Sequence, residues 1–280
     1  MKRRQYMQKF AVKDHEYSLL PEGKWNLVWS DEFDGTELDT TKWDYRLSMM
    51  GKRHPAWTDK AVHLDGKSNA VFSIIEENGL PVSSQLQTGY NFMDEPVQKT
   101  IFEKDDIQWN IGKLKESKFL HRYGYYECRC RLQQNPDAWW SAFWMQSPVI
   151  GSSLDPAESG SEIDIMECFE YGKLHEHNIF TGGYGLDNKK STTGSHPEID
   201  MSEFHRFGVL WDETGYTFYF DGVEDGRVTD YVSKRPQFIL ISTEVVGYRH
   251  KEHAPVQAAI DSIGKDDFLV DYIRVFDKVD

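Results

Sequence analysis

The chain has 280 residues, 14% of them aromatic, with a formal net charge of −14 and a pI near 5.2. Its length fits one large domain, because β-sandwiches and barrels routinely reach this size undivided. The acidic balance argues against a nucleic acid as partner, and against a heavily sulfated polysaccharide unless a local basic groove overrides the average charge.

The N-terminus has no secretory pattern. Residues 1–4, Met-Lys-Arg-Arg, carry three basic side chains and resemble the start of a signal peptide. The polar run 5–9 follows where a signal peptide requires an apolar run. No stretch approaches the roughly 20 apolar residues of a membrane span. We expect a cytoplasmic protein as the sequence stands, or a secreted one if a native leader was removed. The three cysteines, Cys128, Cys130 and Cys168, have neither a disulfide nor a zinc spacing.

The chain divides into a charged N-terminal extension, residues 1–23, and one domain, residues 24–280. The extension is weakly patterned, and we expect it to lie over the domain. The domain opens with a strand and a turn in residues 25–35, which we interpret as structural.

Residues 46–70 lack strand periodicity and are expected to form loops. They contain Arg53 and Trp57, and because loops on a rigid sandwich often carry binding residues, both are candidates for sugar binding. Residues 70–75 form an apolar strand. The polar stretch 76–112 is expected to form long loops.

Two strands with clear patterns follow. Residues 123–132 alternate, with Tyr125 and Glu127 on a polar face and Tyr126 on a core face. In residues 139–145, Trp140 and Trp144 are four apart and therefore share a strand face. Two indoles on a groove floor suit stacking on a sugar ring. The alternative is that one of them fills the core.

Residues 161–167, Ser-Glu-Ile-Asp-Ile-Met-Glu, hold three carboxylates within six residues. Alternation places Glu162 and Asp164 on one strand face, but a regular strand would turn Glu167 toward the core. An unpaired buried carboxylate costs several kcal/mol. One extra residue bulged out near Ile165–Met166 would return Glu167 to the face of the other two acids.

Three carboxylates on one face repel one another, so at least one should keep its proton near neutral pH. A carboxylate beside a carboxylic acid is what cleavage of a glycosidic bond requires. Two alternatives remain: a solvated edge strand with incidental acids, and a calcium site, because clustered oxygen ligands suit that ion.

Later strands add fewer candidates. His175 and His177 share a strand face but have no third soft ligand nearby in the sequence, which argues against zinc. Residues 207–222 read as a hairpin. In the strand 237–245, Ser242 and Glu244 share a face. Residues 268–276, which contain Asp271, form the closing strand. Short strands with little helical periodicity indicate an all-β sandwich.

The sequence Glu-Ile-Asp-Ile-Met-Glu resembles the active-site signature of glycoside hydrolase family 16 in its bulged form. The opening segment 25–43, the Trp-rich strand, the 207–222 hairpin and the closing strand resemble the family too, so the similarity covers roughly residues 25–277. It implies a jelly roll of two curved antiparallel sheets with a substrate groove on the concave face.

The resemblance also implies roles. Glu162 would be the nucleophile, Glu167 the acid and base, and Asp164 a modulator that hydrogen-bonds Glu162. His177 would lie near the nucleophile, and Trp140 and Trp144 match two aromatic positions. Glu244 stands where relatives often hold an aromatic or an amide. Asp271 matches a position that ligates a structural calcium in some relatives, although the reaction itself requires no cofactor.

The sequence therefore predicts a monomeric, endo-acting, retaining β-glycan hydrolase that acts on a polysaccharide, first of all a β-1,3-linked glucan. The alternatives are a β-galactan hydrolase of the agarase or porphyranase type, a carbohydrate-binding protein that has lost catalysis, and a transglycosylase.

Overall fold

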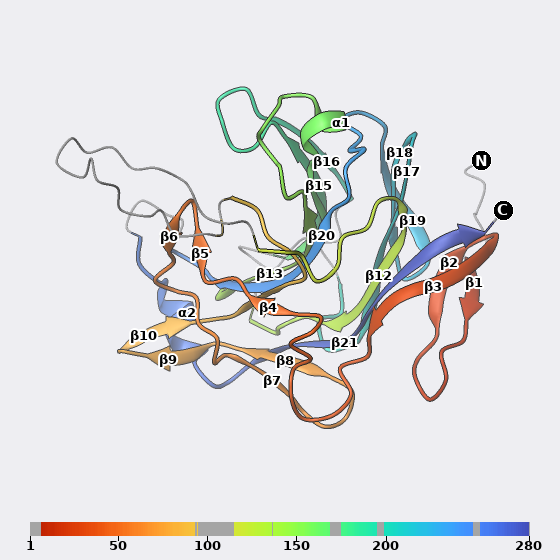
Figure 1. The fold of residues 1–280 in the computed structure, drawn as a ribbon. Coiled ribbons are helices and arrows are strands. Elements are labelled where there is room, and N and C mark those ends of the chain that lie inside the picture. The colour runs from red at the N-terminus through yellow and green to blue at the C-terminus, as the bar shows by residue number, and fades with distance from the viewer. Residues whose placement is uncertain are drawn as a thin grey trace.

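The computed structural model describes residues 7–92, 94, 115–135, 137–168, 175–194, 199–248 and 253–279. Within them the chain forms two large antiparallel sheets packed face to face, with small hairpins at their margins (Figure 1). The all-β sandwich expected from the sequence is confirmed. Neither of the two short helices in this part of the chain, α1 (Pro156–Ser159) and α2 (Gln257–Asp261), could cross a membrane.

The first sheet has seven described strands and carries the candidate catalytic residues. In spatial order they are β16 (Lys189–Thr193), β15 (His175–Thr181), β14 (Glu162–Cys168), β13 (Trp139–Gln146), β20 (Phe238–Val245), β11 (Gln85–Gln87) and β4 (Asp44–Tyr45). Strand β14 thus lies between β15 and β13, away from both described edges of the sheet.

The second sheet covers the inner face of the first. Its order is β19 (Val223–Val228), β18 (Gly215–Phe220), β17 (His205–Asp212), β12 (Gly124–Arg131), β21 (Asp267–Val279), β8 (Ala70–Ser73) and β7 (Val62–Leu64), and β3 (Lys24–Asp31) also pairs with β21. Small hairpins join β1 (Met7–Phe10) to β2 (Ser18–Pro21), β5 (Ser48–Met49) to β6 (Lys52–Arg53), and β9 (Ile75–Glu77) to β10 (Leu80–Val82).

The segments expected to be loops contain short strands. Residues 46–70 include β5, β6 and β7, and the first part of the 76–112 stretch includes β10 and β11. Residue 93 and residues 95–112 of that stretch lie outside the described residues. These strands are two or three residues long, which is too short for alternation to show in the sequence.

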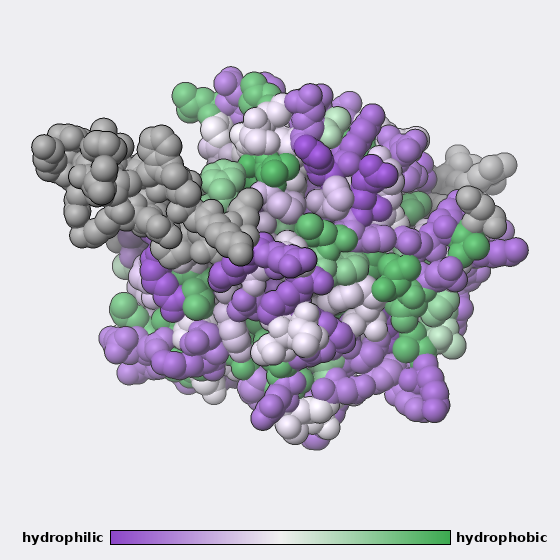
Figure 2. All heavy atoms as spheres, viewed as in Figure 1, coloured by the Kyte–Doolittle hydropathy of each residue, from purple (hydrophilic) through white to green (hydrophobic). Residues whose placement is uncertain are grey.

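The main core lies between the two sheets. Alternation on each strand supplies it: Phe143 and Met145 from β13, Ile163 from β14, and Tyr126 and Cys128 from β12 are all buried there. The opposite residues of the first sheet therefore face away from the core. The exterior is mostly hydrophilic in the view of Figure 2, as expected for a chain with 46 acidic and 32 basic residues.

The described part of the N-terminal extension, residues 7–23, packs against the rest of the domain. The β1–β2 hairpin lies over the outer face of the second sheet, where Leu20 packs with Tyr125 and Phe276. The backbone N–H of Leu19 donates to Glu127, and burial raises the pKa of that carboxyl. The extension lies over the domain as predicted, but the polar face expected on β12 is covered at Tyr125 and Glu127.

Candidate active site

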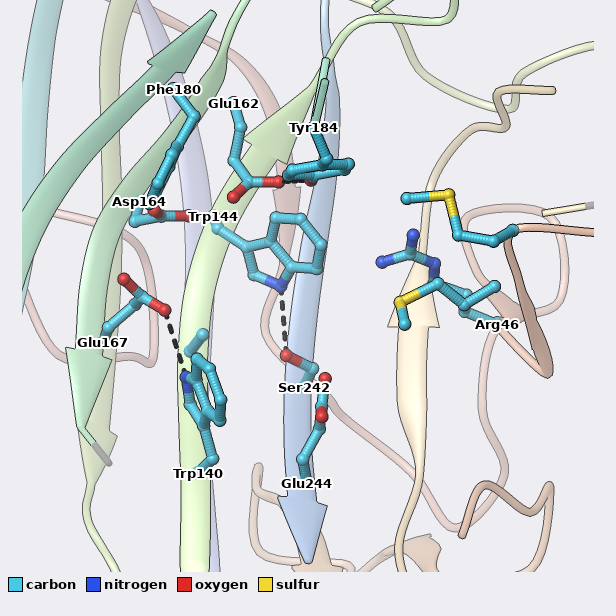
Figure 3. A pocket seen from close by; sticks show the side chains of 13 residues that line it. Arg46, Trp140, Trp144, Glu162, Asp164, Glu167, Phe180, Tyr184, Ser242 and Glu244 are labelled. Atoms are coloured by element: carbon cyan, nitrogen blue, oxygen red, sulfur yellow. Dashed lines mark hydrogen bonds between the residues drawn. The ribbon is translucent and has the colours of Figure 1, made fainter. Parts of the chain in front are cut away.

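A cleft of about 360 Å³ lies on the face of the first sheet that points away from the core. Strands β13, β14 and β20 form its floor, and its walls come from β15, β5 and neighbouring loop residues (Figure 3). The lining residues are Arg46, Met49, Met50, Trp140, Ala142, Trp144, Glu162, Asp164, Glu167, Phe180, Tyr184, Ser242 and Glu244. All three predicted catalytic carboxylates are among them.

The predicted bulge is present in β14. Along the ladder with β13, Phe143 pairs with Met166 and Trp144 pairs with Asp164, so Ile165 has no partner on that side. The ladder with β15 shifts register over the same residues. Ile165 and Met166 both enter the core, and Glu167 returns to the cleft face. The parity argument from the sequence is confirmed.

Glu167 lies in a partly buried, polar environment. It accepts a hydrogen bond from Trp140 Nε1 at 3.0 Å and another from Asn178 Nδ2 at 2.5 Å. Burial raises the pKa of this carboxyl, although the two donors and the positive charge of Lys190 oppose the shift. The group therefore keeps a proton to higher pH than an exposed glutamate, as a general acid must.

The pKa of Asp164 is raised further than that of Glu167. Burial, together with the charges of Glu167 and Glu162, raises the pKa of this carboxyl well above its usual range. Its hydrogen bond to Glu167 raises the pKa of Asp164 and lowers that of Glu167. The sequence predicted that Asp164 would hydrogen-bond Glu162; the hydrogen bond recorded instead goes to Glu167.

Glu162 lies at the other end of the bulge and is 8% exposed. Its Oε2 accepts a hydrogen bond from Gln146 Nε2 at 2.7 Å and another from the Tyr184 hydroxyl. The sequence patterns did not indicate Gln146 or Tyr184, because one ends a strand and the other lies in the loop between β15 and β16. The carboxylate is therefore oriented by residues from two separate segments.

The remaining cleft-floor predictions agree with the structure in position. Both indoles, of Trp140 and Trp144, line the cleft, and Trp144 Nε1 donates to Ser242 Oγ at 3.0 Å. Glu244 also lines it and accepts a hydrogen bond from Gln85 Nε2 at 3.0 Å. The alternative that one indole fills the core applies in part to Trp144, which is 7% exposed and packs with Ala142, Phe238 and Leu240 in a small apolar cluster.

Arg53 and Trp57 do not reach the cleft. Arg53 is exposed and donates to the Leu47 carbonyl. Trp57 is 1% exposed and belongs to the main core. In place of Arg53, another arginine of this region, Arg46, lines the cleft. Its guanidinium lies 5.5 Å from the ring centre of Trp57 and 5.2 Å from that of Trp144.

Arg46 is fixed by a buried chain of hydrogen bonds. Its Nε donates to Asp94 Oδ1 at 2.7 Å, and Asp94 Oδ2 accepts from the backbone N–H of Asn91 at 3.0 Å. Asn91 Nδ2 in turn donates to Gln146 Oε1 at 2.8 Å. Through Gln146 the chain reaches Glu162. Among the described residues, Asp94 accepts the hydrogen bond that the Arg46 guanidinium donates.

Asp271, the predicted calcium ligand, is paired with Arg129, whose Nη1 lies 2.6 Å from Asp271 Oδ2. Across the described ranges no group of three or more His, Cys, Asp and Glu side chains could hold a metal ion.

His177 is buried behind the catalytic strand and does not line the cleft. It stacks on Phe218, and its Nε2 lies 2.9 Å from Asp225 Oδ2. Its Nδ1 lies 2.6 Å from the carbonyl oxygen of Ile165, to which it must donate because a carbonyl only accepts. Its neighbour Asn178 faces the cleft instead, because it pairs with Asp164 in the ladder. His177 therefore supports the bulge from the core side.

Replacing His177 by alanine should destabilise the protein by about 1–3 kcal/mol, because the carbonyl of the bulged residue Ile165 loses its buried donor. Urea unfolding measures the change, with His63→Ala as the exposed-histidine control, which should stay within about 0.5 kcal/mol of the wild type. Equal stability of the two variants would show that His177 does not support the bulge.

Replacing Trp140 by phenylalanine should shift the alkaline limb of the pH profile of kcat/KM to higher pH. The indole N–H lowers the pKa of Glu167, so its loss leaves the acid protonated to higher pH. Trp144→Phe is the matched control, since its indole donates to Ser242 and not to Glu167. An unmoved or lowered limb in Trp140→Phe would contradict the assignment of this limb to Glu167.

Comparison with known proteins decides the family. A family model described as beta-porphyranase A–D, GH16 domain, matches residues 25–278. The chain belongs to glycoside hydrolase family 16. The family was predicted from the bulged carboxylate motif, and the match confirms it over nearly the whole domain.

Two curated relatives illustrate the range of similarity in family 16. A glucan endo-1,3-beta-glucosidase A1 from Niallia circulans is 30% identical, in an alignment that covers 90% of this chain and 38% of that protein. A beta-porphyranase B from Phocaeicola plebeius is 25% identical over 97% of this chain and 94% of its own length. The chain spans about a third of the length of the first two curated relatives it matches.

Solved structures support the family fold. SCLam, a non-specific endo-beta-1,3(4)-glucanase from family GH16, aligns with a TM-score of 0.63 at 19% identity over 99% of this chain and 96% of that chain. The laminarinase catalytic domain from Thermotoga maritima aligns with a TM-score of 0.62 at 20% identity, over 92% of this chain and all of that chain. The jelly-roll prediction is thereby confirmed.

Proposed function

We propose that this chain is an endo-acting β-glycan hydrolase that retains anomeric configuration, working as a monomer without a cofactor. One observation carries the proposal: the bulge in β14 places Glu162 and Glu167 on the same face of a cleft. Retaining enzymes need their two carboxyl groups roughly 5–5.5 Å apart, whereas five residues of straight strand span about 16 Å. A bulged strand under a concave cleft brings the two side chains toward each other.

The first half-reaction uses both glutamates. Glu162 attacks the anomeric carbon, the bond from that carbon to the leaving oxygen breaks, and Glu167 gives its proton to that oxygen. The buried setting that raises the pKa of Glu167 keeps this proton available. Asp164, held protonated beside it, adds no second negative charge next to the acid.

The second half-reaction reverses the role of Glu167. It now accepts a proton from water, whose oxygen bonds the anomeric carbon while the bond to Glu162 breaks. Trp140 and Asn178 donate to the Glu167 carboxylate and so stabilise its ionised form at this stage. Burial of Glu167 therefore favours the acid, and the two hydrogen-bond donors favour the base.

The first candidate substrate is a β-1,3-linked glucan. One of the curated relatives described above, 30% identical over 90% of this chain, is a glucan endo-1,3-beta-glucosidase. The aromatic floor of Trp140 and Trp144 suits the apolar faces of sugar rings.

The second candidate is a galactan of the kind that porphyranases cleave, and Arg46 favours it. This side chain is 2% exposed and lies on the cleft wall between two indoles. A buried guanidinium recognises an anionic substituent, such as a sulfate ester, far better than a neutral hydroxyl. The matching family model, described as beta-porphyranase A–D, also supports this candidate.

A glycan screen tests both candidates. The purified chain is incubated with laminarin, mixed-linkage glucan, agarose, porphyran and carrageenan, and the products are sized over time. Release of oligosaccharides at early times supports endo action, and NMR of the first product reports the anomeric configuration. Inversion of configuration, or binding without cleavage of any glycan, would refute the proposal.

Arg46→Lys separates the two candidates. If Arg46 pairs with an anionic group, this variant should lose activity on porphyran well beyond any loss on laminarin, because lysine cannot form the paired hydrogen bonds of a guanidinium. Equal losses on both glycans would mean that Arg46 serves the cleft's structure and does not select the substrate.

A further inference from the structure

Two donors hold one oxygen of the Glu162 carboxylate. Gln146 Nε2 and the Tyr184 hydroxyl both donate to Oε2, and Gln146 Nε2 also lies 2.5 Å from the Tyr184 hydroxyl oxygen. The three groups thus form a closed arrangement around Oε2. Figure 3 shows the Tyr184 ring beside the Glu162 carboxylate at the upper end of the cleft.

The orientation of the Gln146 amide is fixed from behind. Asn91 Nδ2 donates to Gln146 Oε1 at 2.8 Å, and both side chains are fully buried. An amide oxygen can only accept and an amide nitrogen can only donate. This contact therefore assigns Nε2 to the side of Glu162.

The position of Tyr184 depends on a contact between glycines. Its loop, residues 182–188, joins β15 to β16, and Gly183 has a φ of 66°. A Cβ on Gly183 would lie 3.0 Å from the Cα of Gly151. Any side chain at Gly183 would push this loop away from its neighbour and move Tyr184 off Glu162.

We propose that Gln146 and Tyr184 are positioning residues that divide the two oxygens of Glu162 between two tasks. Oε1 forms and breaks the bond to the anomeric carbon, and Oε2 carries the negative charge between the two donors. This inference rests on the proposed retaining mechanism and adds to it two residues, from separate segments, and an atom assignment.

The arrangement acts mainly on the second half-reaction. When Oε1 bonds the anomeric carbon, Glu162 becomes an ester and Oε2 loses most of its charge. When water attacks, the bond from carbon to Oε1 breaks, its electron pair returns to the carboxylate, and the water proton goes to Glu167. Donors on Oε2 gain strength as this charge returns, so they stabilise the second transition state more than the ester that precedes it.

The test compares Tyr184→Phe with Tyr248→Phe on the best glycan from the screen. Tyr184 is exposed, so its variant keeps the fold, and Tyr248 donates to the Pro81 carbonyl outside the cleft. In Tyr184→Phe, kcat and KM should both fall roughly tenfold, as expected when one hydrogen bond to a charged group is lost. The ratio kcat/KM should stay within about twofold, because it reports the first half-reaction.

Mass spectrometry of acid-quenched enzyme should show more glycosyl-enzyme in Tyr184→Phe than in the wild type or in Tyr248→Phe. A fall in kcat/KM at constant kcat, with no added glycosyl-enzyme, would overturn the inference and leave Tyr184 as a substrate contact. Higher kcat/KM in Tyr184→Ala would also overturn it, since that result marks a steric lid.

A second readout needs no substrate and separates this inference from the proposed function. The ¹³C signal of the Glu162 side-chain carboxyl, assigned by its loss in Glu162→Gln, should shift in Tyr184→Phe and stay in place in Tyr248→Phe. An unchanged signal overturns the inference even if the wild type cleaves a glycan. Failure of the wild type to cleave any glycan refutes the proposed function, and the signal still reports whether Tyr184 holds Glu162.

Discussion

Replacing Glu162 or Glu167 by alanine is expected to lower kcat on a polysaccharide by at least about three orders of magnitude while the fold stays intact. Each substitution removes a group that makes or breaks a bond or moves a proton, and such groups contribute about 10²–10⁴-fold even when they act only as acid or base. Circular dichroism and thermal unfolding check the fold. Asp164→Asn should cost less, because it keeps a hydrogen-bonding group beside Glu167.

The two alanine variants should differ in how they are rescued. Azide should restore turnover to Glu162→Ala by attacking in place of the missing carboxylate, giving a glycosyl azide of inverted configuration. Glu167→Ala should recover on an aryl glycoside, whose leaving group needs no proton. Near wild-type turnover of polysaccharide by either variant would remove that residue from the mechanism, and the opposite pattern of rescue would exchange their roles.

Deleting Met166 should lower kcat by about two orders of magnitude, or about 2.7 kcal/mol of transition-state stabilisation. The deletion leaves Glu-Ile-Asp-Ile-Glu, a regular alternation with all three acids still on the cleft face. Glu167 would remain in the cleft but would lose the side-chain orientation that the bulge gives it. The variant should also unfold at a lower temperature, since a fully buried methionine is removed from the core.

The control for this deletion is Met166→Leu, which conserves volume and should cost less than about 1.5 kcal/mol of stability. It keeps the residue count of β14 and therefore the bulge, so its kcat should match the wild type. A deletion variant that is as active as Met166→Leu would show that the bulge does not aim Glu167.

The sequence predicted the fold class and the catalytic strand for a definite physical reason. Alternation along a strand decides which side chains share a face, and a glutamate at the wrong parity in an apolar strand demands a bulge. That argument needs only local residues. The same local logic correctly put Trp140 and Trp144 together, because both lie on one strand.

The site residues that the sequence did not place correctly depend on how segments far apart in the chain pair and pack. Trp57 and Arg46 belong to one loop region, and nothing local shows that the tryptophan enters the core while the arginine lines the cleft. His177 and Asn178 are neighbours, and only the pairing of β15 with β14 decides which of them faces Glu167. Tyr184 has no strand pattern to place it. A glycine-rich run at residues 182–185 was its one signal.

The polar face of β12 shows a different limit. Alternation correctly placed Tyr125 and Glu127 on the same side, and the closing of the hairpin over them is a long-range event. Glu127 is met there by Leu19 N–H and by the Tyr272 hydroxyl at 2.7 Å. A pattern within one strand reports which residues share a side, but it does not report what covers that side.

The hydrogen-bond chain from Arg46 through Asp94, Asn91 and Gln146 to Glu162 has a consequence for how this enzyme can change. Under the proposed roles of Arg46 and Glu162, substrate choice and catalytic rate are not independent traits, because both side chains share one buried support. A substitution at Arg46 that breaks its pair with Asp94 would also remove part of the support of Glu162. Phe180, which also lines the cleft, is tied to the nucleophile as well, because it pairs with Glu162 in the ladder between β14 and β15.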